Sequence, residues 1–173
     1  YAVSKYTNEL YAKVFHTNYA LPVVGLRYFN IFGPRQDPNG QYAAVIPIFT
    51  DCILNTKQVF INGNGEQTRD FTFVENAVQA NVKAMFSNND ANGEVFNIAF
   101  GENYSVNTLF FSIQKMLESQ HQPTYREPRK GDIENSLADI SKANRLLGYD
   151  PKFSFRDGLE ITVAYFKAHY ATT

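Results

Sequence analysis

Hydrophobic positions near the start of the chain recur at helical spacing. Tyr6, Leu10 and Val14 stand four residues apart, which places them on one face of a helix predicted from residue 1 to about residue 18. A Leu-Pro pair interrupts this pattern, and the nearly continuous apolar run VVGLRYF follows at 23–29. A short run of this kind is typical of a strand buried on both faces of a parallel sheet. The succession of helix, break and buried strand predicts the end of a βαβ unit.

The rest of the chain alternates between helical and β-like patterns. Periodicity and turn residues predict helices over 43–55, 75–86, 105–119 and 141–147 and from 154 onward, strands in 57–74 and 94–101, an extended polar segment at 123–136, and loops at 30–41 and 87–93. The segment 57–74 contains two short β-like runs around a Gly/Asn turn. This alternation predicts an α/β fold.

Several residues predict where the later helices begin, end and face. Ser105 and Ser141 are suited to cap helices, and Gly148 is suited to end one. Ser154 begins the last helix. The buried face of that helix is predicted from apolar residues at helical spacing, namely Phe155, Leu159, Val163 and Phe166.

Composition narrows the class of protein. Hydrophobic residues make up 44% of the 173 residues, which is enough to form a core. A net charge of −1 without a long basic run argues against nucleic-acid binding. No apolar run reaches the roughly 18–20 residues of a membrane span, and no signal peptide is visible. The single cysteine, Cys52, argues against a disulfide scaffold, so we expect a cytoplasmic protein that does not enter a membrane.

Candidate chemistry begins at the first residue. Tyr1 and Lys5 stand one helical turn apart and therefore share a face. A neighbouring ammonium favours the phenolate form of tyrosine, so such a pair can move a proton on and off a substrate hydroxyl. Tyrosine and lysine at this spacing are also common on ordinary helices, so the pair alone leaves both interpretations open.

Three further motifs follow this pair in a fixed order. They are RYFNIFGPRQ at 27–36, INGNGEQTRDFTFVEN at 61–76 and RKGDIENSLADISKA at 129–143. Together with YAVSK they make the chain resemble the extended short-chain dehydrogenase/reductase family, over almost its whole length. Within that family it is most similar to the UDP-sugar 4-epimerases that accept N-acetylated hexosamines.

The resemblance implies a division of the chain. In the family, Tyr-x-x-x-Lys lies about halfway along the enzyme, so we expect this chain to be the C-terminal half of a longer protein. Residues 1–42 would be the remnant of an NAD-binding Rossmann-type domain, and 43–173 mainly the smaller substrate domain. The strand 94–100 and the helix 105–119 are candidates to return to the Rossmann-type domain. The glycine-rich turn for the NAD pyrophosphate and the Ser/Thr partner of Tyr1 would lie upstream.

The resemblance also implies a mechanism. Tyr1, as phenolate, would take the proton of the sugar 4-hydroxyl while hydride passes to tightly held NAD, and the hydride would return to the other face of the 4-keto sugar. Lys5 would lower the pKa of Tyr1 and hold the nicotinamide ribose. Tyr28 and Phe29 would lie near the nicotinamide. A chain without the upstream half is expected to be inactive and to bind UDP weakly at most.

The substrate side is implied by residues that match the family's motifs. Asn30 would hydrogen-bond the nucleotide-sugar. The backbone of Ala44 and Val45 would face the nucleotide. Phe60 would pack against the uracil with Asn62 beside it, although the alternating pattern around Phe60 fits a core position equally well.

Four more positions complete the implied substrate site. Arg69 and Arg129 match the two arginines that clamp the diphosphate, a role that suits guanidinium groups. Asp132 would accept hydrogen bonds from the ribose hydroxyls. Ser136 matches a pocket position that is small in relatives accepting N-acetyl sugars. Taken one at a time, these residues could also be surface arginines and ordinary loop residues.

Other functions remain open from the sequence. A nucleotide-sugar dehydratase or decarboxylase of the same family would share Tyr-x-x-x-Lys. A protein of another class would only bind a nucleotide-sugar, or would serve as an association module through the stripe of Tyr6, Leu10 and Val14. In the family, the helix that carries Tyr-x-x-x-Lys packs in a dimer helix bundle. The resemblance therefore implies a homodimer for the full-length protein. The histidines are scattered without metal-ligand spacing, so no metal site is expected.

Overall fold

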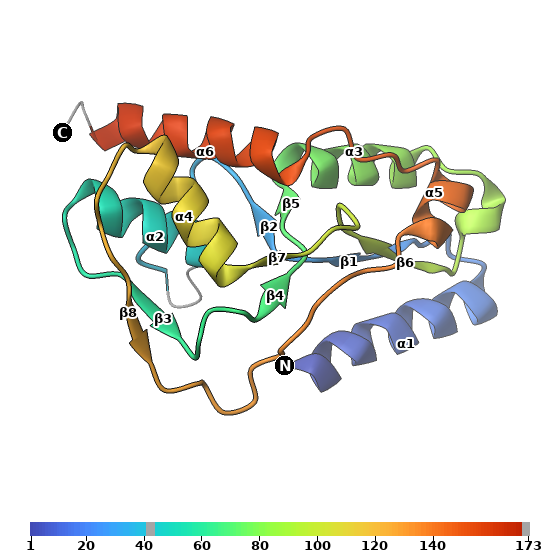
Figure 1. The fold of residues 1–173 in the computed structure, drawn as a ribbon. Helices are drawn as coiled ribbons and strands as arrows, with labels where there is room; N and C mark the ends of the chain where they lie inside the picture. The colour runs from blue at the N-terminus through green and yellow to red at the C-terminus, as the bar shows by residue number, and fades with distance from the viewer. Residues whose placement is uncertain (41–43, 171–173) are drawn as a thin grey trace.

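The computed structural model describes residues 1–40 and 44–170 (Figure 1). Its helices are α1 (Ala2–Tyr19), α2 (Val45–Leu54), α3 (Val74–Met85), α4 (Val106–Met116), α5 (Ser141–Leu147) and α6 (Phe155–Tyr170), with a 3₁₀ turn η1 at Asn89–Ala91. Its strands are β1 (Gly25–Tyr28), β2 (Ile31–Phe32), β3 (Phe60–Asn62), β4 (Thr68–Arg69), β5 (Thr72–Phe73), β6 (Val95–Ile98), β7 (Tyr104–Ser105) and β8 (Thr124–Arg126). The predicted α/β class is confirmed.

The strands pair across long stretches of sequence. β1 pairs in parallel with β6, β2 with β5, and β3 with β8, whereas β4 and β7 are antiparallel. The predicted loop at 30–41 therefore contains a strand, and 57–74 contains three strands where two were predicted. The predicted start of the second helix at Ala43, and the predicted domain boundary between 42 and 43, lie outside the described residues.

Apolar side chains form two clusters. The larger cluster brings α2, α4 and α6 together over β2, β3 and β5. The smaller cluster lies between β1, β6, α3 and α5, and it includes the fully buried Tyr149. In Figure 1, α3 and α5 lie on one side of β1 and β6, and α1 lies on the other. The helix at 106–116 belongs to the larger cluster, whereas the strand at 95–98 belongs to the smaller one.

Side chains at the helix ends explain the boundaries. Ser105 accepts a hydrogen bond from the backbone N–H of Thr108 at 3.0 Å, which confirms it as the N-cap of α4. Ser141 is the first residue of α5 rather than its cap, because the carboxylate of Asp139 accepts the Ser141 N–H at 2.8 Å. Gly148 ends α5 in the left-handed conformation, with φ of 62°, as predicted.

The last helix packs closely on the larger core. Ser154 and Asp157 accept each other's backbone N–H groups at the start of α6. The predicted inner face is confirmed, since Phe155, Leu159, Val163 and Phe166 are all buried. A side chain at Gly158 would come within 2.6 Å of the Phe73 ring, so glycine is needed where α6 approaches β5.

The first helix and strand are more exposed than the sequence predicted. None of the residues in α1 is buried, and Tyr6, Leu10 and Val14 keep about half of their surface. Residues of β1 are half-buried or exposed, because β6 is the only strand that pairs with it in the described part of the chain. No helix within residues 1–40 and 44–170 combines the length and hydrophobicity that crossing a membrane requires.

Candidate functional site

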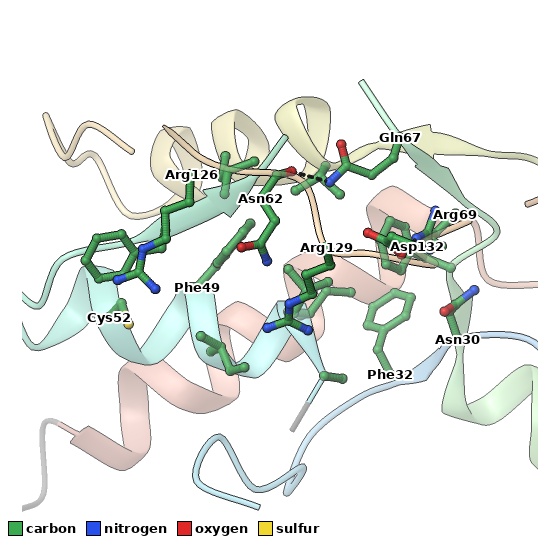
Figure 2. Close-up of a pocket in the computed structure, with 18 of the residues that line it drawn as sticks. Asn30, Phe32, Phe49, Cys52, Asn62, Gln67, Arg69, Arg126, Arg129 and Asp132 are labelled. Carbon is green, nitrogen blue, oxygen red and sulfur yellow. Dashed lines mark hydrogen bonds and ion pairs between the residues drawn. The ribbon is translucent and has the colours of Figure 1, made fainter. Parts of the chain in front are cut away.

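A cavity of about 460 Å³ opens between α2, β3 and the segment that follows β8 (Figure 2). It collects most of the predicted substrate residues, which come from distant parts of the sequence: Asn30, Ala44, Val45, Phe60, Asn62, Arg69, Arg129 and Asp132. Ser136 and Phe29 do not line it. The structure therefore brings together residues that the sequence motifs connected only by analogy with a family.

The apolar wall of the cavity comes mainly from α2. Val45, Ile48 and Cys52 stand three and four residues apart, line the cavity and also pack against the larger core. Other residues of that core share the lining, namely Phe32, Ile46, Phe49, Ile61, Phe71 and Val106. Burial raises the pKa of the Cys52 thiol, with the nearby carboxylate of Asp51 acting in the same direction. Cys52 is therefore a wall residue in its thiol form at neutral pH.

The polar lining is strongly cationic. Arg69, Arg126 and Arg129 all face the cavity, and among the described residues that line it Asp132 is the only carboxylate. In Figure 2, Arg126 and Cys52 lie at one end, Arg129 lies centrally, and Asn30, Arg69 and Asp132 lie at the other end. An arrangement of three guanidinium groups around one carboxylate suits an anionic ligand with several oxygen atoms.

Arg69 is held in place by the segment that carries Asp132. Its guanidinium donates to Asp132 Oδ1 at 2.5 Å and to the carbonyl oxygens of Ile133 and Thr68 at 2.6 and 2.7 Å. The same segment is fixed by backbone hydrogen bonds from Thr68 to Glu134 and from Ser136 to Thr68. Ser136 therefore lies against β4, hydrogen-bonded to Thr68, the residue before Arg69. It does not line the cavity.

Asn30 adopts a conformation that few residues accept. Its φ is +33°, in the left-handed region where asparagine is tolerated better than most side chains. Its side-chain amide donates to the carbonyl of Asp70 at 3.2 Å, and its own carbonyl accepts the N–H of Thr72 at the same distance. The turn after β1 is thereby fixed to β5, and Asn30 is presented to the cavity.

Asp70 connects several segments behind the cavity. Its fully buried carboxylate accepts the N–H groups of Phe100 and Gly101 at 3.1 Å and that of Ala138 at 3.4 Å. Burial raises the pKa of Asp70, although these hydrogen bonds act in the opposite direction. Because Asp70 directly follows Arg69, these hydrogen bonds tie the end of β4 to the segment after β6 and to the segment before α5.

Residues that sequence reasoning missed complete the cavity. Arg126 places its guanidinium carbon 3.1 Å from the centroid of the Phe60 ring. Gln67 donates its side-chain amide to the Asn62 carbonyl at 2.8 Å, which leaves the Asn62 side chain facing the cavity. The parallel pairing of β3 with β8, which brings Arg126 to Phe60, has no local signal in the sequence.

The predicted catalytic pair lies elsewhere on the described chain. Tyr1 and Lys5 line a second cavity of about 590 Å³ between α1 and β1, and Tyr1 is 95% exposed. The ammonium of Lys5 lies 5.4 Å from the centroid of the Tyr1 ring. Tyr28 lines this same cavity, and its hydroxyl donates to the Asn81 side chain on α3 at 2.9 Å. The backbone N–H of Phe29 donates to the Ile98 carbonyl at 3.0 Å.

No metal site emerges from the described residues. Within 1–40 and 44–170, no three side chains of histidine, cysteine, aspartate or glutamate converge on a point where an ion could be held. The polar groups of the first cavity are guanidinium and amide groups with one carboxylate, a set that favours an organic anion over a cation.

Comparison with known proteins places this geometry in context. The family model described as GDP-mannose 4,6 dehydratase matches residues 1–162. A UDP-glucose 4-epimerase from Mycolicibacterium smegmatis is 32% identical over 167 residues, which cover 96% of this chain and 52% of that protein. A UDP-N-acetyl-α-D-glucosaminuronate decarboxylase from Bacillus cytotoxicus is 35% identical over 153 residues, covering 85% of this chain and 47% of that protein. The chain thus spans about half the length of the curated relatives it matches.

Solved structures agree closely with the fold. The UDP-glucose 4-epimerase of Thermotoga maritima with UDP-glucose has a TM-score of 0.93 at 41% identity, over 98% of this chain and 54% of that chain. The UDP-N-acetylglucosamine 4-epimerase of Methanobrevibacter ruminantium, in complex with UDP-N-acetylmuramic acid, has a TM-score of 0.91 at 45% identity and the same coverage. The UDP-glucuronic acid 4-epimerase of Bacillus cereus, solved with UDP-glucuronic acid and NAD, has a TM-score of 0.88 at 34% identity over 97% of this chain and 52% of that chain.

Proposed function

We propose, from the premise that this chain belongs to the NAD-dependent epimerase/dehydratase branch of the extended short-chain dehydrogenase/reductase family, that the full-length protein is a UDP-sugar 4-epimerase. The observation that carries the proposal is the cavity with three arginines, one carboxylate and an apolar wall. Its lining residues are those that match the family's nucleotide-sugar motifs.

The order of groups along the cavity supports a nucleotide-sugar lying lengthwise. Phe60, whose ring carries the Arg126 guanidinium, and Asn62, whose side-chain amide faces the cavity, mark the end that would receive the base. Arg129 and Arg69 would bind the diphosphate through charge-assisted hydrogen bonds. Asn30 would meet the sugar at the other end. Asp132, which its motif assigns to the ribose, also lies at that end in an ion pair with Arg69, so the proposal gives it the role of orienting Arg69 toward the diphosphate. The backbone of Ala44 and Val45 borders the same space.

The proposed chemistry uses the exposed pair on α1. Tyr1 would hold and return the proton of the sugar 4-hydroxyl, and Lys5 would keep the phenolate charge compensated. Both line the groove beside β1, and in the described chain the Lys5 ammonium has no carboxylate partner, so it is free to donate to the ribose hydroxyls of a dinucleotide. NAD, when bound, supplies reversible hydride acceptance at the sugar carbon.

The residues of this chain fit only the nicotinamide riboside end of NAD. Tyr1 and Lys5 can hold the nicotinamide ribose, and Tyr28 and Phe29 stand nearby at the end of β1. The 173 residues contain no glycine-rich turn that opens a helix, the element that binds a dinucleotide pyrophosphate. The proposal therefore assigns pyrophosphate binding to another part of the full-length protein, next to the Rossmann-type remnant of residues 1–42.

The preferred sugar is proposed to be N-acetylated, UDP-N-acetylglucosamine or its 4-epimer. This rests on the motif RKGDIENSLADISKA, in which Ser136 matches a position that is small in relatives accepting N-acetyl sugars; Ser136 is hydrogen-bonded to Thr68 of β4 and does not itself line the cavity. A homodimer formed through the exposed stripe of Tyr6, Leu10 and Val14, and a cytoplasmic location, belong to the same proposal.

A second candidate is a decarboxylase or dehydratase that uses the same nucleotide-sugar site. This candidate is supported by the similarity of the chain to the decarboxylase from Bacillus cytotoxicus. A protein that only binds nucleotide-sugars would share the cavity but would not use Tyr1.

Product analysis separates these candidates. Full-length protein incubated with UDP-N-acetylglucosamine or UDP-glucose is expected to yield the 4-epimer at unchanged mass. Loss of water or carbon dioxide from any UDP-sugar would favour the second candidate, and tight UDP binding without turnover would favour the binding protein.

A further inference from the structure

The aromatic end of the cavity is already covered. The guanidinium carbon of Arg126 lies 3.1 Å from the centroid of the Phe60 ring, so the guanidinium plane occupies the face of that ring. The contact follows from the pairing of β3 with β8, in which Asn62 is opposite Arg126 and Phe60 is opposite Thr124. Arg126 therefore reaches diagonally across two neighbouring strands to cover Phe60.

Arg126 has no competing polar partner in the described chain. Within residues 1–40 and 44–170, its guanidinium forms neither an ion pair nor a side-chain hydrogen bond, in contrast to Arg69. One face of its guanidinium lies on Phe60, and the group also lines the cavity. A guanidinium is planar, delocalised and weakly hydrated, so its second face is suited to stack on a flat ring.

A base that enters this end of the cavity meets Arg126 before it meets the covered face of Phe60. We propose that Arg126 is a base-stacking residue: the pyrimidine of the ligand stacks on the outer face of its guanidinium, and Phe60 supports the guanidinium from below. This inference rests on the proposed function and adds a residue that determines how the base is held. It differs from direct packing of the base on the Phe60 face that Arg126 covers.

Two other roles for Arg126 make different demands. If Arg126 acts as a third diphosphate ligand, binding depends on its positive charge, and its loss weakens ligands with and without a base equally. If Arg126 swings away when the ligand enters, its removal should leave binding unchanged or improve it, because the Phe60 face becomes available at no cost. A stacking role requires both the planar group and a ligand that has a base.

The experiment compares two ligands by calorimetry in the full-length protein: UDP, and ribose 5-diphosphate, which lacks the base. The variants are Arg126→Ala, Arg126→Lys, which keeps the charge but loses the plane, and Arg156→Ala as a control. Arg156 is an exposed residue of α6 that pairs with Glu160 and does not line the cavity. Far-UV circular dichroism and the melting temperature establish that each variant is folded.

Stacking on a guanidinium predicts that both Arg126 variants weaken UDP binding by about 3- to 30-fold. Ribose 5-diphosphate should lose less than about twofold in Arg126→Lys, and Arg156→Ala should match the parent on both ligands. Equal losses on the two ligands with recovery in Arg126→Lys would overturn stacking in favour of a charge role. Unchanged or tighter UDP binding in Arg126→Ala would overturn it as well. Failure of the parent to bind UDP would contradict the proposed function itself. If the parent binds UDP and Arg126→Lys binds it with the same affinity, only the stacking role of Arg126 is contradicted.

Discussion

Arg69 and Asp132, separated by 63 residues in the sequence, form an ion pair of 2.5 Å in the lining of the cavity. The Arg69 side chain is only 17% exposed and that of Asp132 38%, so the pair is screened less than a surface pair. We expect Arg69→Gln and Asp132→Asn to destabilise the protein non-additively, with a coupling free energy of about 1 kcal/mol. Urea unfolding of the two single variants and the double variant measures it. Additive effects would mean that the pair contributes nothing to holding the segment after β8.

Arg129 has no ion pair or hydrogen-bonded partner for its side chain in the described chain, and it lies at the centre of the cavity. Arg129→Ala should therefore lower UDP affinity without lowering stability, by about 10- to 100-fold for the loss of a charged hydrogen-bond donor. Calorimetry with UDP alone tests this, because the sugar is not involved. An affinity equal to that of the Arg156→Ala control would assign Arg129 to the surface.

Tyr1→Phe removes a hydroxyl and keeps the ring. In the full-length enzyme this change should lower the turnover number by about 10²- to 10⁴-fold, the usual effect of losing a general base. Affinity for UDP should stay unchanged, because Tyr1 lines the groove beside α1 and not the cationic cavity. Steady-state rates and UDP titration give the two numbers. Turnover within a few-fold of the parent would remove Tyr1 from the mechanism.

Asp70 gives a prediction for stability against pH. Its pKa is raised by burial, so the folded state binds the proton more tightly than the unfolded state. The contribution to stability is then fully present below the unfolded pKa of about 3.9 and is lost as the pH rises through the folded pKa. Asp70→Asn cannot titrate, and it places an amide N–H₂ against backbone N–H donors, which should cost about 1–3 kcal/mol. The stability advantage of the parent over Asp70→Asn should shrink as the pH rises from about 4.

Asp139 supplies a control with the opposite sign. Hydrogen bonds from Ser141 hold the pKa of its carboxyl below the usual range. Its contribution is therefore present above the unfolded pKa and lost as the pH falls through the folded pKa. Asp139→Asn should accordingly differ most from the parent at neutral pH. The free energy of unfolding is measured by denaturant titration at several pH values, and the difference between the parent and each variant is plotted against pH. If this difference changes with pH in the same direction for Asp70→Asn and Asp139→Asn, the buried carboxylate does not titrate as argued.

Local signals in the sequence were sufficient for the helices and for some of their caps. Ser105 and Gly148 act as predicted because capping depends on residues within one helical turn. Ser141 did not, because its own backbone N–H is bound by the Asp139 carboxylate and it is the first residue of α5, preceded by Ile140 at the cap position. The strands β2 and β7 were not predicted, and β4 and β5 were predicted as one β-like run, because two-residue strands carry no periodicity and are defined by partners far away in sequence.

The residues of the candidate site also fall into two groups, those that local motifs located and those that depend on distant strand pairing. Asn30, Arg69, Arg129 and Asp132 could be located from motifs, because their roles are tied to recognisable segments. Arg126 could not, because its position depends on the pairing of β3 with β8 across more than sixty residues. The burial predicted for β1 was wrong, because a parallel strand is fully covered only within a wider sheet, and within residues 1–40 and 44–170 β6 is the one strand that pairs with it.

Fate of the hydrogen at sugar C4 tests the central claim most directly. Full-length protein is incubated with UDP-N-acetylglucosamine that carries deuterium at C4, and the products are analysed by mass spectrometry and NMR. Oxidation and re-reduction at one carbon predicts a mixture of the two 4-epimers in which the deuterium stays at C4, and Tyr1→Phe should abolish the conversion. Loss of the label to solvent, a product that has lost water, or the absence of any epimer while UDP still binds would contradict the account.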